Sequence, residues 1–220
     1  MAVARQGRAG VMRAAGLAAA LIAAMTTFGV AAQPLPALQE FYFDTDPAAV
    51  PMVVVPADSG DLVDQLMKQR ERGRKALDAT VQLAGVAFSQ GRPELGRTLY
   101  AEASSSTQPT TAAGRAVRWN YGWDLFRLGE VEAALAQWST AQGGMRGNPS
   151  WVPATYALAL WTLGRKDEAV QWYAAAVRTE PQQWGSSARY ADLLPSWRDS
   201  ERATLAEVQK AWAAQPPAWP

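Results

Sequence analysis

Apolar residues recur at helical spacing through most of the chain that follows residue 61. In the first such stretch, Leu66 and Val81 belong to a pattern that runs from residue 62 towards residue 90, and this spacing predicts helix. The charged run 68–75 interrupts the pattern and contains a glycine, which is typical of a solvated face or a kink. Residues 58–61, Asp-Ser-Gly-Asp, precede the pattern and are of the types that cap helix N-termini, so we expect a helix to begin there.

The segment before these helices, residues 33–60, is rich in proline. Each proline removes a backbone donor and biases its predecessor towards extended geometry, so helix is not expected. Two short runs of β-type residues, 41–43 and 53–55, lie inside the segment. They either lie extended on the helical domain or pair with each other as a hairpin. We favour the first arrangement, because so many apolar residues would not be left in water.

Residues 1–32 have the pattern of a signal peptide. The stretch 14–32 is a continuous run of small, apolar and hydroxyl residues that ends in Val-Ala-Ala, so we expect cleavage after Ala32. A positively charged region without acidic residues precedes the run and contains Arg5, Arg8 and Arg13. The alternative is an uncleaved membrane anchor, because the run is just long enough to span a bilayer. We favour cleavage, since alanine-rich runs insert weakly and a good cleavage site follows.

Composition excludes several classes of chemistry. The chain has 220 residues, of which 49% are hydrophobic, and this is enough for the core of one ordinary domain. The net charge of +1 gives no sign of a nucleic-acid partner. Because the chain has no cysteine and no histidine, disulfides, thiolate nucleophiles, Ser-His pairs and zinc fingers are excluded. All ten tryptophans lie after residue 118, which makes the second half unusually aromatic.

Residues 121–181 contain two copies of one helix-turn-helix sequence pattern, and the second copy begins 35 residues after the first (121 to 156). Small residues recur where the two helices would cross, and a small residue there lets helix backbones approach closely. A glycine recurs at the turn, where it ends the first helix in the left-handed conformation. The corresponding positions are Tyr121 and Tyr156, Gly122 and Ala157, Leu125 and Leu160, Leu128-Gly129 and Leu163-Gly164, Ala134 and Ala169, Trp138 and Tyr173, and Ala141 and Ala176.

These residues resemble the tetratricopeptide repeat (TPR) family, whose unit of about 34 residues consists of two antiparallel helices. The resemblance implies an all-α fold, a right-handed superhelical TPR-like solenoid of three to four helix-turn-helix repeats, over residues 61–217. A signal peptide and a proline-rich extended segment would precede it. The terminal copy lacks the turn glycine, as a capping unit can. The Ser/Thr-rich stretch 104–114 is expected to loop out between the first two units. The repeats are expected at about 77–110, 115–149, 150–183 and 184–217.

The resemblance also implies that the first helices line a concave face that binds extended peptides or helices. The positions for a clamp on acidic C-terminal tails hold Trp119 and Trp123, so binding of acidic tails is not expected. The partner-binding residues carried over in this way are Trp119, Asn120, Trp123, Phe126, Arg127, Trp151, Leu158 and Trp161. Further concave-face positions are Val81, Gln82, Gly85, Phe88 and Thr155.

This aromatic strip has three interpretations. It can be a hydrophobic peptide groove, in which tryptophan supplies a large and rigid contact area. It can be a glycan platform, because indole faces stack on sugars. It can also be covered already, by the proline-rich segment around residues 41–55 or by the tail 216–220. Four tryptophans outside the strip are expected to pack between repeats: Trp138, Trp172, Trp184 and Trp212.

No catalytic constellation, metal-ligand set or cofactor motif is recognisable. Two carboxylate pairs could do acid-base work, but both stand at the start of a second helix, where they complement the helix dipole. The glycine-rich stretch 143–147 lacks the Lys-Ser/Thr of a phosphate loop and is expected to be a turn. The aspartates between residues 44 and 61 do not have the spacing of a calcium loop. The carboxylate pairs are Glu130 with Glu132 and Asp167 with Glu168.

The sequence therefore predicts a non-enzymatic protein–protein interaction scaffold of the bacterial cell envelope, periplasmic or secreted. Its partner would be a protein segment bound in the concave aromatic groove. No nucleic acid and no membrane insertion after signal cleavage are expected, and the sequence does not indicate the oligomeric state. Alternatives are a glycan-binding module that uses exposed tryptophans and an enzyme that uses carboxylates alone.

Overall fold

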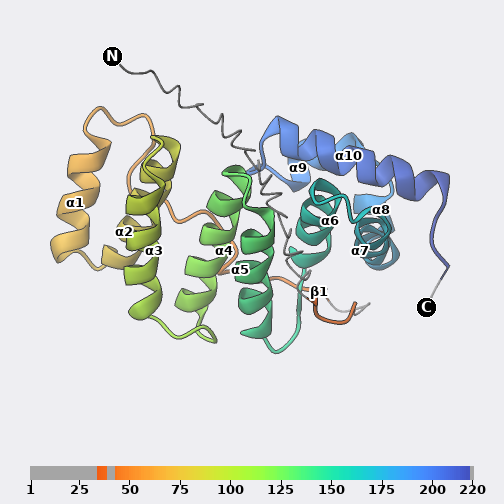
Figure 1. Ribbon diagram of the computed structural model, residues 1–220, viewed down its shortest axis with the longest axis horizontal. Helices are drawn as coiled ribbons and strands as arrows, with labels where there is room; N and C mark the ends of the chain where they lie inside the picture. Colours follow the sequence, from red (N-terminus) through yellow and green to blue (C-terminus); the bar gives the residue numbers. More distant parts are fainter. Residues whose placement is uncertain (1–33, 39–42, 219–220) are drawn as a thin grey trace, which may run out of the picture. The chain divides into compact units, whose positions relative to one another are not determined.

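The structure is a computed structural model that describes residues 34–38 and 43–218 (Figure 1). The expected signal peptide with cleavage after Ala32, its membrane-anchor alternative and the aromatic pair 41–42 lie outside the described residues. Within the described part the chain is almost entirely helical, with ten α-helices, one short 3-10 turn and two strands of two residues each. This confirms the prediction of an all-α fold.

Six of the helices form three consecutive pairs, and the two helices of each pair pack side by side (Figure 1). Their bounds are Ala76–Ser89 (α2) with Pro93–Ser105 (α3), Ala112–Arg127 (α4) with Val131–Gly143 (α5), and Val152–Thr162 (α6) with Lys166–Thr179 (α7). Each turn is only a few residues long, so the two helices of a pair run antiparallel. The Ser/Thr-rich loop before α4 is shorter than predicted, because helix extends into both of its ends.

The three turns have the same backbone structure. Gly91, Gly129 and Gly164 have φ angles of 69°, 85° and 76°. In each turn the glycine N–H bonds to the carbonyl three residues earlier, and the next N–H bonds to the carbonyl five residues earlier. This arrangement satisfies the last carbonyls of the first helix and uses the left-handed conformation that glycine adopts without penalty. The left-handed conformation predicted for Gly129 and Gly164 is confirmed.

Small residues bring the paired helices into close contact. Ala134 and Ala169 are completely buried. At Gly122 the approach is closest, because a Cβ atom there would lie 2.2 Å from Nε1 of Trp138. That indole is itself fully buried and donates its N–H to the carbonyl of Trp119 over 3.2 Å. The crossing of α4 and α5 therefore has no room for a side chain at position 122.

The first helix, α1 (Leu62–Arg72), packs on α2. The charged stretch breaks the helix between Arg72 and Ala76, as the pattern predicted. The expected capping by a side chain is not found, because Asp61 makes no side-chain hydrogen bond to the helix. Its φ of −118° and ψ of 38° lie outside the extended region that an N-cap residue uses to reach the first N–H groups.

The last expected repeat differs from the others. A full first helix is replaced by three fragments, α8 (Pro181–Trp184), the 3-10 turn η1 (Ser187–Arg189) and α9 (Tyr190–Leu193). Pro195 disfavours helical geometry at Leu194, whose φ of −126° and ψ of 56° end the segment. The helix that follows, α10 (Asp199–Ala214), packs on α6 and α7.

The proline-rich segment lies extended against the helices. Strand β1 (Phe43–Asp44) pairs in parallel with β2 (Asn148–Pro149), which follows the glycine-rich turn predicted after α5. Residues 53–55 do not pair with β1 and instead contact α2 through hydrogen bonds. The prediction that these runs lie on the helical domain, rather than forming a hairpin, is therefore confirmed for the described residues.

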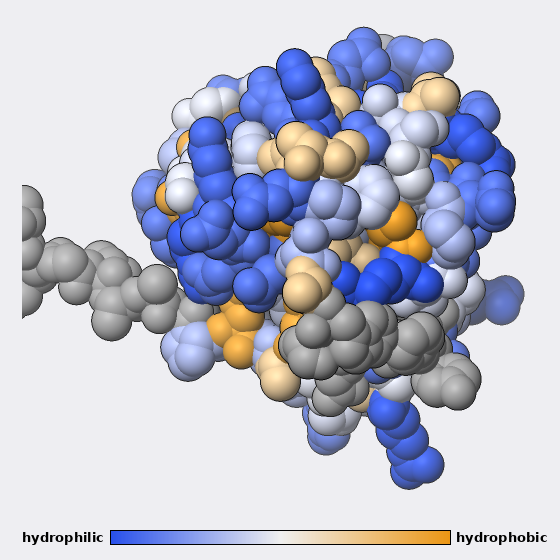
Figure 2. Space-filling model, turned by 90° about the vertical axis from the view of Figure 1, so that its right-hand side faces the viewer, coloured by the Kyte–Doolittle hydropathy of each residue, from blue (hydrophilic) through white to orange (hydrophobic). Residues whose placement is uncertain are grey.

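Buried side chains form two core clusters. One contains Leu66, Val81 and their neighbours in α1–α3, and the other extends from Trp119 to Val208. Tyr121 packs against both clusters. None of the described helices is both long enough and apolar enough to cross a membrane. The face beyond α7, α8 and α10 is mostly hydrophilic, with apolar residues exposed in small scattered patches (Figure 2).

Candidate functional site

Much of the predicted aromatic strip lies in the interior. Trp119 and Trp123 are only 6% and 4% exposed, and Leu158 is fully buried. The Trp123 ring packs edge-on against Trp197, with ring centroids 4.9 Å apart. These three predicted partner-binding residues therefore offer no open groove, because the chain between α9 and α10 fills the space in front of α4.

Asn120 binds the chain itself. Its Oδ1 accepts the N–H of Met52 over 3.1 Å, and its Nδ2 donates to the carbonyl of Val50 over 3.0 Å. Nδ2 also donates to the carbonyl of Ala116 one turn earlier in α4. A side-chain amide on the predicted concave face thus forms hydrogen bonds with the backbone of an extended segment, and this segment, around residues 50–52, belongs to the same chain.

Gln82 does the same from α2. Its Oε1 accepts the N–H groups of Val54 and Val55 over 2.7 and 3.0 Å, and its Nε2 donates to the carbonyl of Val55. The Val55 side chain is buried in the first core cluster. Of the three interpretations of the strip, covering by the proline-rich segment is therefore what the structure has along α2 and α4.

We call residues 43–55 the strap. A salt bridge also anchors it to α4, because Nε and Nη2 of Arg115 lie 3.3 and 3.2 Å from the two carboxylate oxygens of Asp46. The Asp46 side chain is 1% exposed, and it also accepts the N–H of Ala48. A buried charge pair of this kind is costly to break, so the strap is a fixed part of the fold.

The remaining predicted strip residues also make internal contacts. Arg127 forms a two-pronged salt bridge with the buried Glu201 of α10, with N–O distances of 2.9 and 3.2 Å. Phe126 is half-buried, and its ring meets that of Trp123 edge-on. Trp161 is half-buried and donates its indole N–H to Glu207 over 3.1 Å. Helix α10 is held on α4 and α6 by these contacts.

The tryptophans assigned to packing do pack. Trp138, Trp172 and Trp184 are buried, and Trp212 is half-buried against the second core cluster. Trp212 of α10 contacts Tyr173 of α7, as predicted for packing between repeats. Trp138 instead contacts α4, and Trp172 contacts Tyr156 of α6, so these two pack within their own helix pairs. One of them, Trp184, has a second face that borders the cavity described next.

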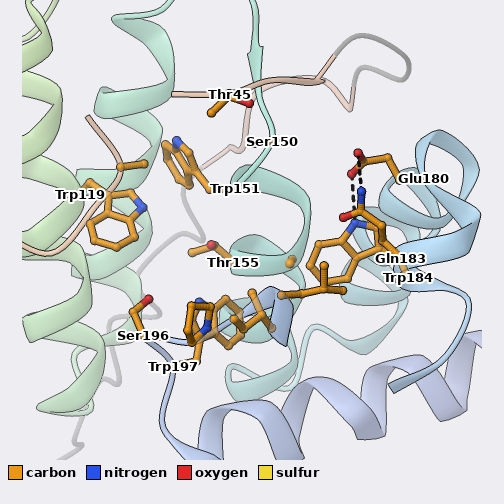
Figure 3. A pocket seen from close by; sticks show the side chains of 15 residues that line it. Thr45, Trp119, Ser150, Trp151, Thr155, Glu180, Gln183, Trp184, Ser196 and Trp197 are labelled. Carbon is orange, nitrogen blue, oxygen red and sulfur yellow. Dashed lines mark hydrogen bonds between the residues drawn. The ribbon is translucent and has the colours of Figure 1, made fainter. Parts of the chain in front are cut away.

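Four tryptophans surround a cavity of about 380 Å³ at one end of the strip (Figure 3). Trp119 comes from α4, Trp151 precedes α6, Trp184 ends α8 and Trp197 precedes α10. Polar side chains complete the wall, namely Thr45, Ser150, Thr155, Glu180, Gln183 and Ser196. The cavity has the size of a small-ligand site and lies between two helix pairs and the irregular last unit.

Two of these indoles have unsatisfied donors. Nε1 of Trp119 and Nε1 of Trp151 are buried and have no hydrogen-bond partner among the described residues. Figure 3 shows the Trp119 nitrogen on the cavity side of its ring. Leaving a buried donor unpaired costs about 1–3 kcal/mol, and Nε1 of Trp123 is unpaired in the same way although Trp123 does not line the cavity.

Glu180 is the one charged side chain among the described residues that line the cavity. Its carboxylate accepts a hydrogen bond from Nε2 of Gln183 over 3.0 Å and a long one from Nε1 of Trp184 over 3.4 Å (Figure 3). It forms no salt bridge with any residue that the structure describes. The cavity therefore combines aromatic walls with a single negative charge.

Sequence reasoning nominated Trp119, Trp151 and Thr155, and the structure brings all three to this cavity. It did not nominate Glu180 or Trp197. These two residues reach the cavity only because the last unit is broken into short turns. The absence of a turn glycine near residue 198 was the available signal that this unit is irregular.

Other polar groups have structural environments. Glu130 pairs with Arg97, and Glu168 pairs with Arg165, which holds the pKa of Glu168 below its ordinary value. Asp124 accepts the Tyr100 hydroxyl over 2.6 Å, and burial raises the pKa of this carboxyl. The described residues contain no group of three or more carboxylates that could hold a metal ion.

Comparison of the chain with protein-family models, with curated proteins and with solved structures finds no match. What the chain binds has to be inferred from the chemistry of the cavity itself.

Proposed function

We propose that this chain is a non-enzymatic binding module built of TPR-like helical repeats, and that it holds a segment of a partner protein at the tryptophan cavity. The observation that carries the proposal is the cavity between Trp119, Trp151, Trp184 and Trp197. Tryptophan supplies rigid contact area with a polar edge, and such residues dominate the binding energy of many protein interfaces.

The strap defines how a partner can bind. An extended peptide cannot lie along α2 and α4, because Gln82 and Asn120 already bind the strap backbone. A partner segment would instead lie across the cavity mouth and insert one side chain.

The similarity of the three helix pairs supports the TPR-like part of the proposal. Each pair has the same glycine turn, and small residues occupy the crossing in the central pairs. We infer that the pairs form a right-handed superhelical stack of the TPR type, in which the irregular last unit is the cap. A polar outer face is expected of a capping unit, and Figure 2 shows a mostly hydrophilic face there.

The proposed place of action is the bacterial cell envelope. The pattern of residues 1–32 supports export, with cleavage after Ala32 and a periplasmic or secreted product. The partner would then be a protein of the same compartment.

The test is a photo-crosslinker at Gln183, which is half-buried at the cavity wall. Crosslinking in the envelope of the source cell should give a discrete protein adduct. The adduct should be lost when Trp151→Ala is added and kept when Trp161→Ala is added, because Trp161 is half-buried outside the cavity. Melting temperatures of both variants verify that the chain stays folded. An adduct that survives Trp151→Ala would contradict a partner site at the cavity.

A second candidate function is saccharide binding, which the hydroxyl groups of Thr45, Ser150 and Ser196 beside the indoles favour. Retention of the chain on peptidoglycan, abolished by Trp151→Ala, is the result expected for this alternative. The protein adduct described above would then not form.

A further inference from the structure

We propose that the tryptophan cavity selects an arginine side chain of the partner segment, with Glu180 as its counter-ion. The inference rests on the proposed function and names the chemistry of the residue that enters. Three observations lead to it: the single charge among the described lining residues, the indole walls, and the site at Arg127, where an indole face and a carboxylate hold an arginine.

The charge of the cavity favours a cation. Glu180 is half-buried, and among the described residues its carboxylate receives hydrogen bonds from neutral groups, those of Gln183 and Trp184. No Lys or Arg is among the described residues that line the cavity. A partly desolvated carboxylate attracts a cation and repels an acidic side chain.

The indole walls favour a cation as well. The negative face of an indole ring attracts ammonium and guanidinium groups, and the attraction increases where water is excluded. Trp151 and Trp184 belong to opposite sides of the cavity (Figure 3). A side chain that enters between them would therefore meet aromatic surface and the Glu180 carboxylate together.

The chain contains this arrangement once with its cation in place, at Arg127, and a partial form of it at Lys166, which forms no salt bridge among the described residues. The Arg127 guanidinium lies 5.2 Å from the centre of the Trp123 ring and is paired with Glu201. Nζ of Lys166 lies 4.7 Å from the centre of the Trp161 ring, whose N–H donates to Glu207.

The Trp184 indole N–H donates to Glu180, as that of Trp161 donates to Glu207. Among the described residues no cation lies over the Trp184 ring. The cavity thus has an indole ring and a carboxylate in contact, and the partner would supply the cation.

Arginine fits better than lysine. A guanidinium is planar, so it can stack on an indole while its N–H groups meet a carboxylate side-on. Its remaining donors suit a cavity whose lining includes hydroxyl groups, among them that of Thr155. Lysine offers a compact charge without the planar face.

The test measures binding of three blocked tripeptides to the whole chain by calorimetry. The peptides are acetyl-Gly-Arg-Gly-amide, its citrulline counterpart, which has the same shape without the charge, and acetyl-Gly-Glu-Gly-amide. We expect the arginine peptide to bind at least roughly tenfold more tightly than the citrulline peptide, which is about the value of one desolvated cation–π contact. The glutamate peptide should not bind.

Glu180→Gln should reduce the preference for arginine over citrulline to the part that the indole faces supply, and leave binding of the citrulline peptide unchanged. The matched control is Glu207→Gln, which alters a carboxylate that also accepts an indole N–H but lies outside the cavity. This control should keep the arginine preference. The citrulline comparison needs no variant, so it remains decisive if Glu180→Gln weakens α8.

Equal binding of the arginine and citrulline peptides, or no binding of the arginine peptide, would overturn the inference. So would retention on peptidoglycan in place of peptide binding. The proposed function is judged separately by the crosslink at Gln183. If Trp151→Ala abolishes that adduct while the peptides show no preference, the cavity binds a partner protein, but it does not select an arginine side chain.

Discussion

At the scale of single residues, close packing decides which positions tolerate change. Interiors of proteins are packed as densely as organic crystals, so one added methyl group needs space that must already exist. Gly122 has none, whereas no atom lies within 4 Å of the Cβ that an alanine would place at Gly143. These two glycines of the α4–α5 pair therefore make a matched test.

Gly122→Ala should lower the free energy of unfolding by about 1–3 kcal/mol, because its methyl group would press on the buried Trp138 ring. Gly143→Ala should change it by less than about 1 kcal/mol and can be stabilising, since alanine favours helix over glycine. Urea unfolding of both variants gives the two values. Equal effects would mean that the crossing is looser than described.

A second prediction at the scale of single residues concerns the buried carboxyl group of Asp124 and the pH dependence of stability that it causes. Burial raises the pKa of its carboxyl above the ordinary value, and the hydrogen bond from Tyr100 acts in the opposite direction. Since the pKa is higher in the folded than in the unfolded chain, this group favours folding at acid pH. That contribution is lost as the pH rises through the folded-state pKa.

Asp124→Asn removes the titration. The free energy of unfolding of the variant, minus that of the natural chain, should therefore increase from about pH 4 upwards, the region above the ordinary pKa of aspartate. Urea unfolding between pH 3.5 and pH 7 measures the difference. The exposed Asp192→Asn is the control for the same substitution at the surface. A difference that decreases with pH would show that the buried carboxylate is stabilised.

At the scale of elements, the strap determines what the helical face can bind. Side-chain amides of α2 and α4 hold the extended backbone at 50–55, and the salt bridge of Asp46 holds the segment before it. A face that would otherwise be open is thereby closed by a segment of the same chain. Helices α2 and α4 can then receive a partner only outside the strap.

Each amide should protect its own part of the strap. Gln82→Ala should abolish hydrogen-exchange protection of the Val54 and Val55 amides and leave that of Met52, whereas Asn120→Ala should do the reverse. Each change should cost about 1–3 kcal/mol, because backbone groups lose their partners. The exposed Gln69→Ala is the control. Loss of protection along the whole strap in either variant would indicate that it opens as one unit.

The sequence predicted the elements that depend on local chemistry. The glycine turns at 129 and 164, the break near Gly73 and the extended 53–55 run follow from backbone preferences, which neighbouring residues already express. The broken last unit was harder to predict, because a single Pro195 outweighs a helical pattern in Tyr190–Leu194.

The candidate site could be predicted only in part. Trp119 and Trp151 were identified from repeat register, whereas their burial depends on contacts with distant segments such as 194–197. Periodicity shows which face of a helix is apolar, but it does not show what covers that face. The Glu180 carboxylate reaches the cavity through a non-helical turn that has no periodic signature.

At the scale of the whole molecule, stability depends on how the two core clusters are coupled. In repeat proteins, each unit is stabilised mainly by its neighbours. Tyr121 belongs to this boundary, because its ring stacks on Tyr100 at 4.2 Å between centroids and also packs against the second cluster. Removing the ring should weaken the coupling more than it weakens either cluster.

The distribution of tryptophan makes this coupling measurable. Each tryptophan that the structure describes lies in or against the second cluster, so indole fluorescence reports on that half, whereas circular dichroism reports on all helices. In the natural chain we expect the two signals to change together in urea. In Tyr121→Ala, circular dichroism should begin to change at lower urea, because the smaller first cluster loses its neighbour.

Tyr121→Phe keeps the ring and should keep the two curves together, which separates the loss of stacking from the loss of the hydroxyl. Coincident curves in Tyr121→Ala at a lower midpoint would mean that the helices share one cooperative core. The strap is a second connection that could produce coincident curves, since Val55 is buried in the first cluster while Asp46 is paired with Arg115 of α4. Combining Tyr121→Ala with Arg115→Ala therefore distinguishes coupling through the ring from coupling through the strap.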